Sequence, residues 1–79
     1  MNAKTRVQGR KIIEALKDAQ FALQELLEGE QEKLENMPES RQGGEKGDAL
    51  ANAIGDLEQA DMSLEITLQS LNDACGCEA

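Results

Sequence analysis

The stretch that decides the fold is residues 50–75, LANAIGDLEQADMSLEITLQSLNDAC. Leucines recur every seven residues along it, and a second set follows each leucine by four residues. Such alternating steps of four and three predict a coiled-coil seam on a long helix. The oligomerisation and register residues predicted on this seam are Leu50, Ile54, Leu57, Asp61, Leu64, Leu68 and Leu71, and Cys75 ends it.

A second helical stripe precedes this stretch. The same alternating steps join Ile12, Leu16, Ala19, Leu23 and Leu26. The stripe is widened on one side by Ile13, Leu27 and Leu34. A stripe broader than one seam is typical of a bundle helix that contacts two neighbours.

A polar, glycine-rich segment separates the two stripes. Pro38 removes a backbone donor, and the pair Gly43-Gly44 disfavours helix. We therefore predict an all-α, antiparallel helical hairpin in a single domain of residues 1–79, with helices at about 4–36 and about 47–75 and a turn at about 37–46. Facing residues should have numbers that sum to roughly 83, which places Leu16 near Leu68, Leu26 near Leu57 and Leu23 near Asp61.

The core of such a hairpin is small. Of 31 hydrophobic residues, 10 are alanine and two are cysteine, which leaves 19 large apolar side chains. A core of this size is close to the lower limit for a fold that stands alone. We therefore expect a homodimer, in which two hairpins form a four-helix bundle.

Charge is unevenly distributed along the chain. Residues 1–17 carry a net charge of +4 and residues 47–79 a net charge of −7, within a total of −8. The basic start of the first helix should lie beside the acidic end of the second. The acidity either keeps the protein in solution or mimics a phosphate backbone and binds a basic groove on a partner protein. The predicted partner-binding carboxylates are Asp56, Glu58, Glu65 and Asp73.

Several side chains break the pattern. Asp61 occupies a central seam position, where it either fixes the register, paired with Gln20 or Lys17, or faces a ligand or an arginine of a partner. The apolar residues Phe21, Met62 and Ile66 fall outside the seams. They indicate a second interface, either with another copy or with a different protein.

The residue types argue against catalysis. There is no histidine, tryptophan or tyrosine, and no constellation of side chains suggests an enzyme. Cys75-Gly76-Cys77 lacks the other ligands of a zinc site, so we expect no metal or cofactor; Gly76 should cap the second helix and Cys77 should be an exposed thiol. The net charge and the lack of stacking aromatics disfavour direct nucleic-acid binding. No segment reads as a membrane span or signal peptide, which favours a cytoplasmic protein.

The segment Asn36-Met37-Pro38-Glu39-Ser40-Arg41-Gln42 resembles the hairpin Asn-Met-Pro-Glu-Asn/Ser-Leu-Gln of small uncharacterised bacteriophage and prophage proteins with two acidic helices. Arg41 stands where those proteins usually have leucine. The resemblance implies a phage or mobile-element origin and carries over no catalytic residue. It favours a non-catalytic accessory protein that binds and inhibits a host protein, in an anti-defence or anti-CRISPR role.

Two other functions remain open. The chain could be a homo-oligomeric structural or assembly protein. It could also be a sponge for a small signalling nucleotide, bound by Arg6, Arg10 and Lys11.

Overall fold

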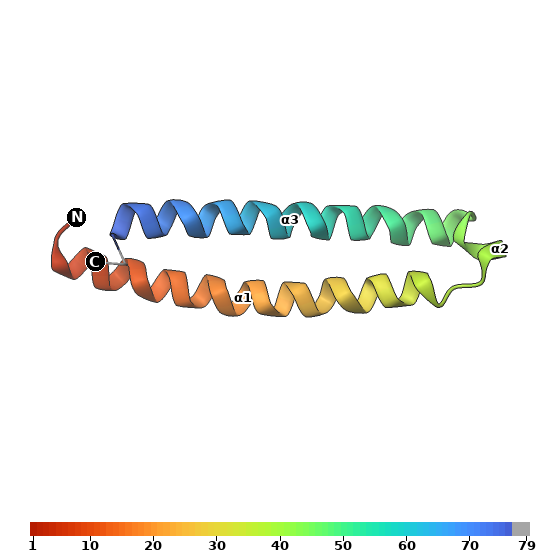
Figure 1. The fold of residues 1–79 in the computed structure, drawn as a ribbon, viewed down its shortest axis with the longest axis horizontal. Coiled ribbons are helices and arrows are strands. Elements are labelled where there is room, and N and C mark those ends of the chain that lie inside the picture. The colour runs from red at the N-terminus through yellow and green to blue at the C-terminus, as the bar shows by residue number, and fades with distance from the viewer. Residues whose placement is uncertain (77–79) are drawn as a thin grey trace.

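The computed structural model describes residues 1–76. Two long helices, α1 (Ala3–Glu35) and α3 (Glu45–Cys75), lie side by side and antiparallel, and the short helix α2 (Glu39–Gln42) joins them at one end (Figure 1). The molecule is a rod of 58 × 15 × 15 Å. The predicted all-α helical hairpin is therefore confirmed.

Local side-chain chemistry fixes the outer ends of the long helices. Asn2 caps α1, because its side-chain oxygen accepts a hydrogen bond from the backbone N–H of Thr5 at 2.9 Å. Gly76 ends α3 in the left-handed conformation, with φ 57° and ψ 43°, and its N–H donates to the carbonyl oxygen of Asn72. The predicted role of Gly76 as a helix cap is thus confirmed, whereas Cys77 lies outside the described residues.

The connection contains a turn of helix instead of an irregular loop. The Pro38 carbonyl oxygen accepts hydrogen bonds from the backbone N–H groups of Arg41 and Gln42, which forms α2. The side-chain amide of Gln42 then donates to the carbonyl oxygens of Leu34 and Met37, at 3.1 and 2.9 Å. The Leu34 carbonyl oxygen also accepts a hydrogen bond from the backbone N–H of Met37, at 3.2 Å. Gln42 therefore closes the connection onto α1.

The seam of α3 follows the heptad pattern of the sequence. Ile54 and Leu68 are buried, and the other five predicted seam residues are half-buried between the helices: Leu50, Leu57, Asp61, Leu64 and Leu71. Cys75 ends the seam and is 2% exposed. Near it, Ile13, Leu68 and Cys75 form a buried cluster against which Leu16 and Leu71 pack.

The observed seam of α1 is shifted by one residue from the predicted seam at every second position. The side of α1 that faces α3 carries Gly9, Ile13, Leu16, Gln20, Leu23, Leu27 and Leu34, all buried or half-buried. Ile12, Ala19 and Leu26 are exposed instead, and Leu26 is 51% exposed. The observed seam takes Ile13 and Leu27 in place of the equally large Ile12 and Leu26, and it brings Gln20, in place of Ala19, to Asp61.

Candidate functional site

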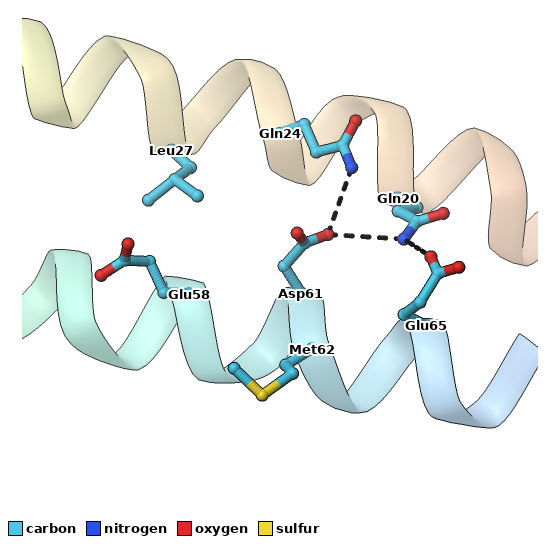
Figure 2. A pocket seen from close by; sticks show the side chains of 7 residues that line it. All are labelled: Gln20, Gln24, Leu27, Glu58, Asp61, Met62 and Glu65. Atoms are coloured by element: carbon cyan, nitrogen blue, oxygen red, sulfur yellow. Dashed lines mark hydrogen bonds between the residues drawn. The ribbon is translucent and has the colours of Figure 1, made fainter.

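A shallow groove of about 380 Å³ runs between α1 and α3 near their middle. Figure 2 shows Gln20, Gln24 and Leu27 on one wall, all from α1. The opposite wall is formed by α3 and carries Glu58, Asp61, Met62 and Glu65. Three carboxylates and no cation therefore line the groove.

The two glutamines of α1 donate hydrogen bonds to two of these carboxylates, Asp61 and Glu65. The Nε2 of Gln20 lies 2.6 Å from Glu65 Oε2 and 3.5 Å from Asp61 Oδ1, and the Nε2 of Gln24 lies 3.4 Å from Asp61 Oδ1 (Figure 2). The short bond to Glu65 is the strongest of the three, since hydrogen bonds weaken towards 3.5 Å. Asp61 thus meets the predicted Gln20, together with Gln24, which sequence reasoning missed although it lies one helical turn after Gln20.

The structure separates the four carboxylates predicted to bind a partner. Glu58 and Glu65 line the groove. Asp56 precedes Glu58 by two residues, which corresponds to roughly 200° around a helix, so it lies on the other side of α3. Asp73 is exposed near the C-terminal end of α3, two helical turns beyond Glu65. These residues do not form one continuous surface.

The three apolar residues outside the seams are exposed: Phe21 and Met62 at 66% each, and Ile66 at 62%. Met62 lines the groove, and Ile66 follows it by one helical turn. Phe21 directly follows the groove residue Gln20, which places it on the groove side of α1. Apolar side chains therefore border the carboxylates on both helices.

The basic start of α1 lies beside the C-terminal part of α3, as Figure 1 shows. A second groove of about 250 Å³ there is lined by Arg10, Ile13, Glu14, Lys17 and Asn72. Lys11 follows Arg10 directly and so points roughly 100° away around α1. Among the charged side chains of residues 1–76, the ion pair in the structure joins Lys33 and Glu30 within α1, at 2.9 Å. The expected neutralisation across the hairpin therefore has no direct ion pair.

Within residues 1–76, no three His, Cys, Asp or Glu side chains gather in a way that could hold a metal ion. Nor does any helix in that part of the chain have the length and apolar character needed to cross a membrane.

Together, the fold and the groove define an acidic helical hairpin with an apolar-bordered carboxylate groove. Comparison of the chain with protein-family models, curated proteins and solved structures gives no match. The function must therefore be argued from the residues themselves.

Proposed function

We propose that the chain is a non-catalytic accessory protein of a phage or mobile element, which binds a basic surface of a host protein and inhibits it. In its concrete form the role is anti-defence or anti-CRISPR, with the groove carboxylates in place of the phosphates of a nucleic acid. Binding would take place in the cytoplasm of the host cell. The phage setting rests on the resemblance of the 36–42 segment, and the binding surface rests on the groove.

The observation that carries the proposal is the set of carboxylates in the groove. Glu58, Asp61 and Glu65 lie within two turns of α3, and no Lys or Arg lines the groove with them. Carboxylates oriented by neighbouring amides are good acceptors for arginine, whose guanidinium group donates two parallel hydrogen bonds. The groove therefore suits an arginine-bearing surface.

The apolar border supplies the second part of such an interface. Met62 is exposed and lines the groove with the carboxylates, and Phe21 is exposed on the groove side of α1. Interfaces commonly take most of their binding energy from a few aromatic and other large apolar side chains, surrounded by polar contacts. Ile66 and Asp73 would extend the contact along α3, whereas Asp56 lies on the other side and takes no part.

A matched pair of charge reversals tests this surface. The tagged protein is incubated with a bacterial lysate, the captured protein is identified, and its affinity is measured for Glu58→Lys and for Asp56→Lys. Both substitutions change the net charge equally and lie two residues apart on α3. We expect Glu58→Lys to weaken binding by at least about tenfold, which corresponds to roughly 1.4 kcal/mol. Asp56→Lys should leave the affinity within about twofold.

Salt provides a second readout of the same contact. Binding through exposed charges should weaken steeply between about 50 and 500 mM salt, because the screening length shortens over that range. Affinity that is insensitive to salt, or lost equally in both variants, would contradict the proposal. The mass of each variant is measured by light scattering, so that a change in oligomeric state is not mistaken for lost binding.

A homo-oligomeric structural role is the second candidate. Ile12 and Leu26 favour it, since both are 51% exposed and belong to a stripe with no neighbour in the chain. The nucleotide sponge has less support, because Glu14 shares the second groove with Arg10 and Lys11 points elsewhere. The inhibitor and the structural protein differ in their predictions. A structural protein should lose its function when self-association is lost, and it should bind no host protein through the groove.

A further inference from the structure

The side of the hairpin away from the groove carries mainly small and apolar side chains, with Lys33 and Asp56 as charged residues directly before the seam. On α1, Ile12, Ala19 and Leu26 directly precede the seam residues Ile13, Gln20 and Leu27. On α3, Ala53, Ala60, Thr67 and Ala74 directly precede seam residues in the same way. In an antiparallel pair of helices, positions that precede the seam lie along one edge, and those that follow it lie along the other.

The groove confirms this assignment of sides. Gln24, Glu58 and Glu65, which line it, directly follow the seam residues Leu23, Leu57 and Leu64. The opposite side, called here the small-residue face, is formed by Ile12, Ala15, Ala19, Ala22 and Leu26 of α1 and by Ala53, Ala60, Ser63, Thr67, Ser70 and Ala74 of α3. All of these side chains are exposed, and Asp56 is the one carboxylate within the α3 part of the stripe.

The solvent-accessible surface area of the molecule is large for its mass. The chain exposes 5871 Å², whereas a compact monomer of 8.6 kDa exposes about 4,700 Å². The excess is roughly 1,200 Å² per chain. A stable interface between proteins buries roughly 800 Å² on each partner, so a second copy can cover the small-residue face within this excess. Within residues 1–76, only Ile13, Ile54, Leu68 and Cys75 are buried apolar residues, which leaves the single hairpin with a thin core.

The charge distribution along α1 favours one direction for a second copy. Residues 1–17 carry five cations and Glu14, a net charge of +4, and residues 18–35 carry six carboxylates and Lys33, a net charge of −5. The acidic half of α1 lies beside residues 45–60, whose net charge is −3, so the hairpin does not neutralise it. A second copy with its α1 antiparallel on the first α1 places each basic half on an acidic half. A parallel arrangement would join the acidic halves.

The side chains on α1 fit this arrangement. If α1 of one copy is packed antiparallel so that Ala19 faces Ala22 of the other, Ile12 faces Gly29 and Ala15 faces Leu26. Each large side chain then meets a small one, which allows the close packing of helices in a bundle. In this register Lys11 of one copy is level with Glu30 of the other.

We infer that two copies of the chain form an antiparallel four-helix bundle through the small-residue face, with α1 on α1 and α3 on α3. Both carboxylate grooves lie on the outside of this dimer. The dimer does not depend on the proposed function, since it uses the opposite side of the hairpin.

Two substitutions on α1 separate this face from the groove side. Ala19 and Phe21 are both exposed, two residues apart, and Ala19→Glu and Phe21→Glu each add one negative charge. In sedimentation or light scattering, the wild-type protein and Phe21→Glu should have twice the chain mass of 8.6 kDa, and Ala19→Glu should have the chain mass itself. Ala60→Glu on α3 should act like Ala19→Glu. A monomeric wild type, or a dimer lost in Phe21→Glu and kept in Ala19→Glu, would overturn the proposal.

A zero-length carbodiimide cross-link tests whether the α1 helices of the two copies are antiparallel. The experiment uses the wild-type protein, so its result does not depend on the folding of a variant. Lys11 and Glu30 of one chain are about 28 Å apart along α1, beyond the reach of such a link. A Lys11–Glu30 link in the wild-type dimer must therefore join two copies, as the antiparallel arrangement requires. A dimer that forms no such link has a different arrangement. Glu58→Lys should remain dimeric and Ala19→Glu should keep its groove, so failure of the dimer is distinguishable from failure of partner binding.

Discussion

Gly9 of α1 lies against Cys75 of α3, so closely that a Cβ atom on Gly9 would overlap the Cys75 Sγ. Both residues are buried, and Cys75 belongs to the cluster that Ile13 and Leu68 complete. Glycine is needed at position 9 because the two helices approach each other most closely where one of them has no side chain. The contact closes the open end of the hairpin, opposite the turn.

Gly9→Ala should therefore destabilise the protein, although alanine favours helix. The overlap with Cys75 should lower the free energy of unfolding by about 1–3 kcal/mol, and the higher helix propensity of alanine returns up to about 1 kcal/mol. The net loss should be about 1–2 kcal/mol in urea unfolding followed by circular dichroism. Gly55→Ala is the control, since nothing lies within 4 Å of its Cβ position; it should gain about 0.5–1 kcal/mol.

A double substitution locates the cause. In the Cys75→Ala background the sulfur is absent, so Gly9→Ala should lose less stability there than in the wild type. Equal losses in both backgrounds would mean that the contact between Gly9 and Cys75 does not limit the approach of the helices.

Gln42→Ala should weaken the turn. The Gln42 amide donates to the carbonyl oxygens of Leu34 and Met37, and each such bond contributes about 0.5–1.5 kcal/mol. We expect the free energy of unfolding to fall by about 1–2 kcal/mol. Gln42→Glu should be at least as damaging, because a carboxylate cannot donate to a carbonyl group. Ser40→Ala, which changes an exposed residue of α2, is the control; an equal effect there would show that the bonds of Gln42 are not the cause.

Gly47→Ala should be more damaging than Gly43→Ala. A Cβ on Gly47 would overlap the Gln42 carbonyl oxygen and lie 2.6 Å from that of Arg41, and these backbone atoms cannot move without a shift of α2. At Gly43 nothing lies within 4 Å. We expect Gly47→Ala to lower the free energy of unfolding by about 2 kcal/mol or more and Gly43→Ala to change it by less than about 1 kcal/mol. Similar effects at the two positions would contradict the packing of α2 on α3.

The seam of α3 was predictable because each position of its heptad pattern offers a single candidate residue. That residue is apolar at every position except Asp61. On α1, apolar or small residues stand in adjacent pairs, such as Ile12 with Ile13 and Leu26 with Leu27. Both candidate seams share Leu16 and Leu23, so periodicity on α1 alone cannot choose between them. The facing helix makes the choice, since Asp61 needs the amide of Gln20 and Cys75 needs the space at Gly9.

The same dependence explains why the arrangement of the site residues could not be predicted from the sequence. The acidic residues of α3 were visible in the sequence, but which of them share a side depends on the seam, and the count of carboxylates does not show that Asp56 lies away from Glu58. Gln24 carries no charge and gives no signal until Asp61 is placed opposite it. The helix α2 was missed because four residues between a proline and two glycines are too few to show a helical period, although Glu39, Arg41 and Gln42 favour helix.

Asp61→Leu should stabilise the hairpin and loosen its specificity. The leucine would bury apolar surface at a half-buried seam position, which should raise the free energy of unfolding by about 1 kcal/mol, and Gln20 would keep its bond to Glu65. Without the polar layer of Gln20 and Asp61, a continuous apolar seam allows other pairings of helices, so light scattering should reveal masses above that of the wild type. Asp61→Asn keeps a polar side chain in the layer and should retain the wild-type mass. If Asp61→Leu shows a single, unchanged mass, Asp61 is not a register device, and its remaining role is to present a carboxylate in the groove.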